Sequence, residues 1–187
     1  IMVKTGLGHS KRRKPNGITK AERNARKSDD LLHRDFNADK PCQKCVTDIT
    51  EIKGSNGKLY VSAIYDCFAC LHYPELRNAI IHSDRGSQYT SKEYRETIRQ
   101  YEIRQSMNSD GGRCHDNARC ESIWARMKEE LFYGRIRTED YTVDELKQMV
   151  WRYFMSYWNN RRICTANGGL PPMVKRKYYY ASIEAAA

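Results

Sequence analysis

The strongest constraint on the fold is a series of three strand-like runs between residues 45 and 84. Two of them, CVTDITEI at 45–52 and KLYVSAIYDCF at 58–68, are rich in Val, Ile, Thr and Tyr, and the turn-forming sequence KGSNG separates them. A shorter run, NAIIHSD at 78–84, follows. Runs of this kind with a glycine turn between them are typical of antiparallel strands. We therefore predict a hairpin and a third strand in one sheet.

The rest of the chain is predicted to be mainly helical. SKEYRETIRQYE at 91–102 forms one helix, and residues 117–132 form a second with one apolar face made by Ile123, Trp124, Met127 and Leu131. TVDE at 142–145 is a capping box that opens a third helix, which carries Leu146, Met149, Val150, Tyr153, Phe154 and Tyr157 at helical spacing. Strands followed by helices predict an α/β fold, a mixed sheet with flanking helices.

Three carboxylates lie at or near the ends of these elements. Asp48 is in the first strand, Asp84 ends the third, and Glu121 lies in the first turn of the helix at 117–132. Carboxylates that meet at one sheet edge repel one another unless a cation separates them, and oxygen ligands suit Mg²⁺ or Mn²⁺. Two such ions roughly 3.5–4 Å apart can activate an attacking oxygen and stabilise the leaving oxygen of a phosphodiester. The simpler interpretation is that each acid is an ordinary exposed residue.

The helix at 117–132 also aligns two polar residues with Glu121. Lys128 lies two turns after Glu121 on nearly the same face, and Asn117 lies one turn before it. A cation at this spacing would hold a phosphate backbone beside the carboxylates.

The charge of the chain favours a polyanionic partner, of which nucleic acid is the commonest. The chain has 33 Lys and Arg against 23 Asp and Glu, a net charge of +10, and much of the excess lies in residues 1–40. We predict that these residues form a basic arm or linker, with a short helix near 19–27. The alternative is that the charge serves only solubility.

The expected location is the bacterial cytoplasm, in association with the nucleoid. We find no apolar run of membrane-spanning length and no signal-peptide pattern, so no membrane partner is expected. The seven cysteines are then expected to be reduced. The chain begins with Ile1 and Met2, as a fragment of a longer reading frame would.

Four segments together resemble the catalytic region of bacterial insertion-sequence transposases. They are VTDITEIKGSNGKLYVSAIYDCF, IIHSDRGSQYTSKEY, QSMNSDGGRCHDNARCESIWARMKEEL and WRYFMSYWNNRRICTANGGLPP. The family that they resemble is called insertion sequence three and lies in the DDE, or retroviral-integrase, superfamily. The resemblance covers about residues 12–180, and the string HSDRGSQYTS followed by CHDNARCES is specific.

This resemblance implies a ribonuclease H-like fold and a metal-dependent site that cleaves DNA strands and transfers them during transposition. It implies that two Mg²⁺ or Mn²⁺ ions are held by the catalytic acids Asp48, Asp84 and Glu121. It places four further residues at the site or on DNA, namely Lys128, Asn117, Gln88 and Tyr89. Arg161 is a further cation that would contact phosphates. DNA is thus the implied substrate, and self-association is implied for the active protein.

The catalytic core implied by the resemblance, residues 41–180, is followed by a tail at 181–187 and is shorter than the fold requires. A ribonuclease H-like core needs a second strand, a third strand and a crossover helix between Asp48 and Asp84. After the second strand only residues 67–78 remain, and a crossover to a parallel strand takes about a dozen residues by itself. We therefore predict a core shortened near 67–72, without one strand and much of one crossover helix. Apolar groups such as Ile64, Ile80 and Ile81 would then be exposed.

A zinc module is the main alternative from another class of protein. Two CxxC pairs are close to zinc-ribbon spacing, and their members are Cys42, Cys45, Cys67 and Cys70. Zinc is disfavoured because Cys45 begins a strand and Cys70 falls at the shortened junction.

Two further interpretations concern catalysis. A thiol nucleophile at Cys114 or Cys120, with His115 as base, lacks the rest of a triad. A shortened core could also have lost catalysis and kept only basic, sequence-tolerant DNA binding. Whether the chain is an active enzyme is therefore left open by the sequence.

Overall fold

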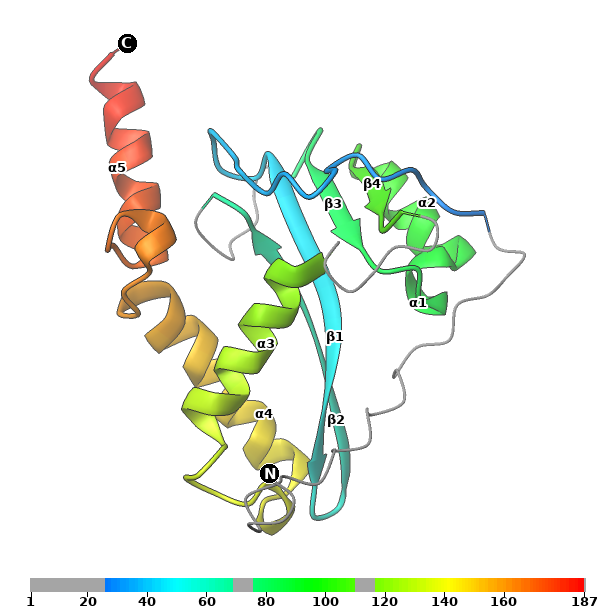
Figure 1. Cartoon of the computed structure of the whole chain (residues 1–187), viewed down its shortest axis with the longest axis vertical. Coiled ribbons are helices and arrows are strands. Elements are labelled where there is room, and N and C mark those ends of the chain that lie inside the picture. Colours follow the sequence, from blue (N-terminus) through cyan, green and yellow to red (C-terminus); the bar gives the residue numbers. More distant parts are fainter. Residues whose placement is uncertain (1–25, 69–75, 110–116, 187) are drawn as a thin grey trace, which may run out of the picture.

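The computed structural model describes residues 26–68, 76–109 and 117–186, and Figure 1 shows their arrangement. Its centre is a four-stranded mixed sheet with the strand order β2-β1-β3-β4. β1 (Lys44–Gly54) and β2 (Gly57–Asp66) form an antiparallel hairpin. β3 (Ile80–Ser83) pairs in parallel with β1, and β4 (Arg104–Met107) pairs in parallel with β3. The predicted hairpin and third strand are confirmed, whereas the sequence did not predict β4.

The hairpin is long, and its turn supports the helix that follows much later in the chain. At Gly54 an added Cβ would lie 3.0 Å from both the Tyr141 carbonyl oxygen and Leu146 Cδ1. The backbone amide of Ser55 donates to that same carbonyl oxygen at 2.8 Å. The absence of a side chain at residue 54 therefore lets the start of α4 (Val143–Arg152) pack against the hairpin turn.

Two short helices connect β3 to β4. α1 (Ser87–Thr90) leads into α2 (Lys92–Gln100), and Ser91 caps α2 by accepting a hydrogen bond from the Tyr94 amide. Because this connection joins parallel strands, it has to cross one face of the sheet. In Figure 1 both helices lie beside β3 and β4, away from the long hairpin.

Three longer helices complete the fold. α3 (Ala118–Leu131) and α4 match the predicted helices, and α4 begins with the predicted capping box of Thr142 and Glu145. α4 continues as a π-helix at Tyr153–Trp158, and α5 (Pro172–Glu184) follows. Two 3-10 turns, Thr138–Asp140 and Thr165–Asn167, lie between them.

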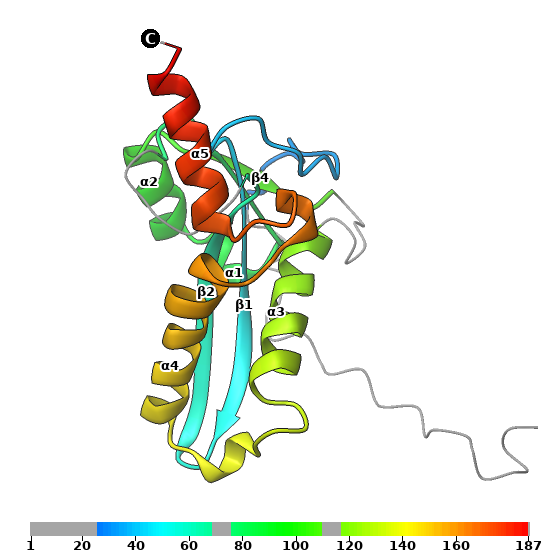
Figure 2. The same ribbon diagram turned by 90° about the vertical axis from the view of Figure 1, so that its left-hand side faces the viewer.

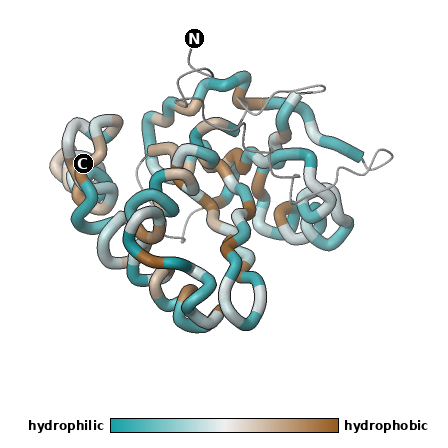
Figure 3. Tube along the Cα trace, turned by 60° about the horizontal axis from the view of Figure 1, so that its bottom comes forward, coloured by the Kyte–Doolittle hydropathy of each residue, from teal (hydrophilic) through white to brown (hydrophobic). Residues whose placement is uncertain are grey.

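The main core lies where α3 and α4 meet the hairpin, and both helices run alongside it in Figure 2. Trp124 of α3 meets Phe154 edge to face, with ring centroids 5.8 Å apart. Val46, Met127 and Leu146 are completely buried in the same cluster. Figure 3 shows the hydrophobic residues gathered toward the middle of the trace and hydrophilic residues along its outside. The apolar faces predicted for these helices thus form the core.

α5 docks on the far end of β2 through charged residues. Arg176 is buried and approaches the buried carboxylate of Asp66 at 3.9 Å. Lys175 donates to the carbonyl oxygen of Phe68 at 2.9 Å and lies 4.4 Å from the centre of the Phe68 ring. These contacts hold the C-terminal helix on the core, and α5 extends into the segment that the sequence predicted to be a tail.

The end of the predicted arm also packs on the core. The Leu31 amide donates to Ser106 Oγ at 2.9 Å, and the Asp29 carbonyl accepts from the Met107 amide at 3.2 Å. These contacts lay residues 29–31 along β4, the edge strand of the sheet. Leu32 is buried in the main core. The helix predicted near 19–27 lies almost wholly outside the described residues.

Within the described residues, two strands precede the crossover to β3, where a full ribonuclease H-like fold has three. In the described parts of this link, residues 67–68 and 76–79, no helix is present. The fold is therefore ribonuclease H-like with a shortened sheet. The prediction that Ile81 would be exposed is wrong, because only 1% of its surface is accessible. Ile64 and Ile80 are partly buried, since the remaining helices still cover much of the sheet.

No helix within the described ranges is both long enough and apolar enough to cross a membrane.

Candidate active site

The three predicted catalytic acids are carried by three neighbouring elements. Asp48 lies in the middle of β1, Asp84 directly follows β3, and Glu121 lies in the first turn of α3. In the parallel pairing of β1 and β3, Val46 is aligned with His82. Asp48 and Asp84 each lie two residues beyond this aligned pair, so the two acids come at the same level of neighbouring strands.

The pKa of Asp48 reports how these acids affect one another. It is raised to about 6, chiefly because the carboxyl is partly buried and then because the negative charges of Asp84 and Glu121 lie nearby. A hydrogen bond from the Ile49 amide and the positive charge of Lys128 act in the opposite direction. The fold therefore places Asp84, Glu121 and Lys128 close enough to Asp48 for their charges to act on its carboxyl group.

Asp84 is held by the turn that follows β3. The Gly86 amide donates to Asp84 Oδ1 at 2.9 Å, which is the local hydrogen bond of an Asx turn. A Cβ on Gly86 would lie 2.5 Å from Gln88 Nε2, so a larger residue at position 86 would displace Gln88. The turn thus fixes Asp84 and brings Gln88 close to it.

β4, the strand that sequence reasoning missed, braces both sides of Asp84. Buried His82 is held between Ser106 Oγ (2.8 Å from Nδ1) and Asn108 Oδ1 (2.9 Å from Nε2). On the other side, Arg85 Nε donates to the Asn108 carbonyl oxygen at 2.6 Å. Asn108 therefore anchors the residues that flank Asp84. The only sequence signal for this role was a histidine at a strand end.

α3 is positioned against β1 by its first residues. Asn117 is buried, and its Nδ2 donates to the Thr47 carbonyl oxygen at 3.1 Å, one residue before Asp48. Lys128 is half-buried, and burial lowers its pKa, while the nearby acids Glu51 and Asp48 oppose that shift. The predicted alignment of Asn117, Glu121 and Lys128 along one helix face agrees with these contacts.

Lys128 also opens onto a cavity beyond the carboxylates. The cavity has a volume of about 640 Å³ and lies between the hairpin and the end of α3. Its charged lining residues are Glu51, Lys53, Lys128, Arg137 and Glu139. Three of these five residues are basic, so an anionic group can be accommodated in the cavity beside Lys128.

Tyr89 is a buried neighbour of the site. Its hydroxyl lies 3.4 Å from Thr47 Oγ1. Burial, together with the charges of Asp48 and Asp84, raises the pKa of Tyr89 well above its usual value. Only 3% of its surface is accessible, so Tyr89 supports the site from behind and does not reach a substrate in this conformation.

Arg161 is exposed in the turn that follows the π-helix. The neighbouring Arg162 contacts α3. Arg162 forms a two-pronged ion pair with Glu130, with its shortest distance 2.7 Å between Nη2 and Oε1. Glu130 also accepts from the Tyr153 hydroxyl at 2.8 Å. Arg162 therefore joins α3 to α4, which is a structural role.

The described cysteines of the alternative interpretations are buried. Cys42, Cys45 and Cys67 form no disulfide among the described residues, and Cys42 Sγ accepts a hydrogen bond from Arg176 at 3.9 Å. Burial raises the pKa of Cys67 to about 12 and that of Cys45 further. Cys120 is buried beside Glu121 and its pKa is also raised by burial. Such environments keep thiols protonated, unlike those of reactive thiolates. Cys70, Cys114 and His115 lie outside the described residues.

The three carboxylates interact electrostatically, but their oxygen atoms are not gathered around one point as the ligands of a bound metal ion are. Among residues 26–68, 76–109 and 117–186, no three His, Cys, Asp or Glu side chains are gathered closely enough to hold a metal ion. Two features nevertheless fit a cation with a bound anion. The negative charges of Asp84 and Glu121 both raise the pKa of Asp48. In the same described ranges, the buried atoms Asn117 Oδ1 and Gln88 Nε2 have no hydrogen-bond partner.

The raised pKa of Asp48 predicts a pH-dependent cost to folding in the absence of divalent metal. Below about pH 4 both the folded and the unfolded chain hold the proton. As the pH rises to about 6, the unfolded chain releases its proton first, and stability falls until the folded Asp48 also ionises. We therefore expect Asp48→Asn to gain melting temperature relative to the unaltered protein between pH 4 and 6, and to keep that gain at higher pH.

Thermal melts in EDTA at half-unit pH steps measure this effect. The exposed Asp140 provides the control variant Asp140→Asn, which removes the same charge in the 3-10 turn between α3 and α4. A difference between Asp48→Asn and the unaltered protein that stays constant from pH 4 to 7 would contradict the shift.

The sheet carries one acid on a central strand and one after the neighbouring parallel strand, and the helix α3 carries the third. This fold and this arrangement of acids are those that the resemblance to insertion-sequence transposases implied. No protein-family model matches the chain. Individual relatives do match. An uncharacterized transposase-like protein of Haemophilus influenzae is 36% identical over 169 residues, which cover 78% of this chain and 76% of that protein. The transposase InsF for insertion sequence IS3A of Escherichia coli is 30% identical over 170 residues, 78% of this chain.

The chain therefore belongs to the family of insertion-sequence transposases, as its motifs predicted. It spans 57% of the length of InsF, so it corresponds to little more than half of that protein. Among solved structures, the catalytic core domain of HTLV-2 integrase in complex with magnesium aligns with 75% of this chain at 14% identity and a TM-score of 0.49.

Proposed function

We propose that this chain is the catalytic core of a DNA transposase, which cleaves DNA strands and joins them to new positions. The observation that carries the proposal is the convergence of the charges of Asp84, Glu121 and Lys128 on Asp48. Burial is the larger cause of the raised pKa of Asp48, but the negative charges of Asp84 and Glu121 add to it, and a cation among these three acids would relieve their repulsion. An acid cluster of this kind serves no purpose in a protein that only grips DNA phosphates.

Asp48, Asp84 and Glu121 are the residues that would hold Mg²⁺ or Mn²⁺, because hard cations prefer carboxylate oxygens. When bound, a pair of such ions supplies activation of the attacking oxygen, from water or a DNA 3′-hydroxyl, and stabilisation of the leaving oxygen. The three side chains come from separate elements, so they would have to turn toward one another to share a cation. Hydrogen bonds made by Asn108 and Asn117 tie the Asp84 turn to the end of β4 and the start of α3 to β1.

The remaining residues of the site would bind and orient DNA. Lys128 can pair with a phosphate from the rim of the cavity that it lines. Gln88 is partly exposed beside the Asp84 turn and would contact the DNA strand. Asn117 is buried and would act by holding the start of α3 on β1. Tyr89 would support the Asp48 side of the site from behind, through Thr47. DNA transposition usually brings two DNA ends together, so self-association is part of the proposal.

Nicking of supercoiled plasmid DNA tests the proposal. The purified protein is incubated with plasmid in Mg²⁺, in Mn²⁺ and in EDTA, and open-circular DNA is quantified by gel. The expected result is nicking with either metal and none in EDTA. A folded protein that binds DNA but gives no nicking with either metal would favour the second candidate, a transposase relative that only binds DNA. That candidate draws its support from the shortened crossover and the open carboxylate set.

A further inference from the structure

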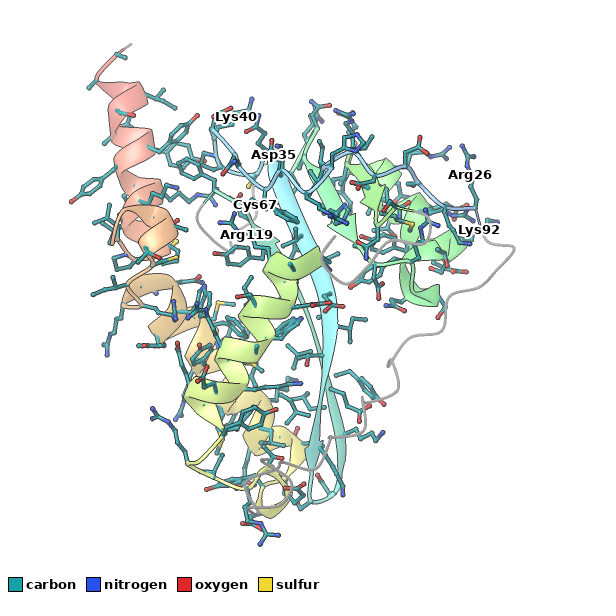
Figure 4. The ribbon with its side chains drawn as sticks, viewed as in Figure 1. Arg26, Asp35, Lys40, Cys67, Lys92 and Arg119 are labelled. Atoms are coloured by element: carbon teal, nitrogen blue, oxygen red, sulfur yellow. The ribbon has the colours of Figure 1, made fainter. Side chains whose placement is uncertain are left out.

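A second cluster of charge lies outside the carboxylate site, on the opposite side of α1. A cleft of about 470 Å³ is formed by α2, β4 and residues 26–28. Its four basic lining residues are Arg26, Lys92, Arg95 and Arg99, and its one acidic lining residue is Glu96. Figure 4 shows Arg26 and Lys92 projecting at the same edge of the molecule from these two elements.

Three of the cations form a row along one face of α2. Lys92, Arg95 and Arg99 are spaced i, i+3 and i+7, so they follow one side of the helix over about 10 Å. Glu96 approaches Lys92 at 3.8 Å. In the parts of the chain that the structure describes, Arg26, Arg95 and Arg99 have no acidic partner. The row therefore presents net positive charge to solvent.

The row is unfavourable for the isolated protein. Like charges three or four residues apart on a helix destabilise it, as Lys92 and Arg95, and Arg95 and Arg99, do here. Lys92 is the first residue of α2, where the positive end of the helix dipole disfavours a cation. An arrangement that costs stability in the free protein is explained by an anionic partner that lies along α2.

The floor of the cleft is rigid and connects to the carboxylate site. Ser28 donates to Gln105 Oε1 at 3.0 Å, and Gln105 Nε2 donates to the Tyr89 carbonyl oxygen at 2.7 Å. The Tyr89 hydroxyl in turn lies beside Thr47, the neighbour of Asp48. Tyr89 of α1 thus contacts both the cleft, through its carbonyl oxygen, and the neighbour of Asp48, through its hydroxyl group.

We infer that this basic cleft binds the phosphate backbone of duplex DNA outside the bond that is cleaved. The inference rests on the proposed function, because it assumes that DNA lies at the carboxylates. DNA that passes over α1 reaches Lys92 and then Arg95 and Arg99, with Arg26 on the opposite wall. The contacts are to phosphates, so the cleft adds affinity and orientation without sequence preference.

Duplex DNA binding by the full chain tests the inference. Fluorescence anisotropy with a labelled duplex of mixed sequence is measured in EDTA over a range of NaCl concentrations. The variant Arg95→Ala/Arg99→Ala is expected to bind on the order of 10 to 100-fold more weakly at low salt. It is also expected to reduce the slope of log affinity against log salt by about 2, because each lost phosphate contact removes about 0.9.

The matched control is Lys147→Ala/Arg152→Ala on α4. Both residues are exposed, and like Arg99 in α2, Arg152 lies in the last turn of its helix. The control is expected to change affinity less than 3-fold. Equal losses in the two double variants would mean that only net charge matters, and this would overturn the cleft assignment. Tighter, Arg95-dependent binding of a single-stranded RNA would also overturn it.

Failure of the cleft and failure of the proposed function give different results. Unchanged DNA binding and metal-dependent nicking in Arg95→Ala/Arg99→Ala would overturn the cleft assignment alone. No duplex binding by the unaltered protein would overturn the proposed function together with the cleft.

Discussion

Replacement of Glu121 by Gln is expected to lower metal-dependent plasmid nicking by on the order of 10³-fold or more. The substitution keeps the size and hydrogen-bonding reach of the side chain and removes its charge. Glu121 lies in the first turn of α3, where it acts electrostatically on Asp48. Loss of one charged ligand removes several kcal/mol of stabilisation from the reacting phosphate, and each 1.36 kcal/mol corresponds to a factor of ten in rate.

The control for Glu121→Gln is Glu129→Gln, because Glu129 is an exposed acid near the other end of the same helix. It is expected to nick plasmid at close to the rate of the unaltered protein. Circular dichroism and DNA binding should be retained by both variants. Nicking by Glu121→Gln within a few fold of the unaltered protein would exclude Glu121 as a ligand, and the activity would then belong to another site or to a contaminating nuclease.

Replacement of Trp124 by Ala is expected to cost about 3–5 kcal/mol of unfolding free energy. Only 5% of the Trp124 surface is accessible, and the ring packs edge to face on Phe154 of the π-helix that continues α4. This contact joins α3, which carries Glu121, to the rest of the core. Domains of ordinary stability have only about 5–15 kcal/mol in total, so a large share would be lost.

Urea denaturation followed by circular dichroism measures this loss. Trp151→Ala is the matched control, because Trp151 is on α4 with 64% of its surface exposed. It should change stability by no more than about 0.5 kcal/mol. Similar losses in the two variants would contradict the packing of α3 on α4. Nicking by Trp124→Ala should fall more steeply with temperature than nicking by Trp151→Ala.

Much of the fold could be predicted from hydrophobic periodicity. The hairpin, the third strand and helices α2, α3 and α4 each have a strong local pattern, and Thr142 and Glu145 marked the start of α4 correctly. β4 was missed because RQSM (residues 104–107) has little β-branched or apolar character. It becomes a strand through its parallel pairing with β3 and through residues 29–31 along its other edge, which are long-range contacts that no local pattern records.

The burial of Ile81 could not be predicted either. The sequence showed a shortened crossover and therefore an uncovered face, whereas burial depends on which other elements occupy the space. Ile98 of α2 and Met107 of β4 are also buried, and their elements lie next to β3 on that side of the sheet. The surface of β3 is therefore less exposed than the short crossover before it led us to expect.

The members of the candidate site were predictable, but its supports were not. Asp48, Asp84 and Glu121 could be chosen because each occupies a strand or helix position next to a motif. Asn108, which braces the residues around Asp84, has no motif of its own, and its role depends on a strand that was missed. Tyr89 was expected to line the site or touch DNA, and its burial places it behind the site instead.

Titration of Mn²⁺ by isothermal calorimetry tests most directly whether the three carboxylates of the shortened core hold a divalent cation. The unaltered protein is compared at pH 7 with Asp48→Asn, Asp84→Asn, Glu121→Gln and the control Glu129→Gln. We predict binding by the unaltered protein and by Glu129→Gln, weakened at least about 10-fold in the other three variants. Binding should also weaken at pH 5, where Asp48 holds its proton. Equal Mn²⁺ binding by all five proteins, or none by the folded unaltered protein, would contradict the account.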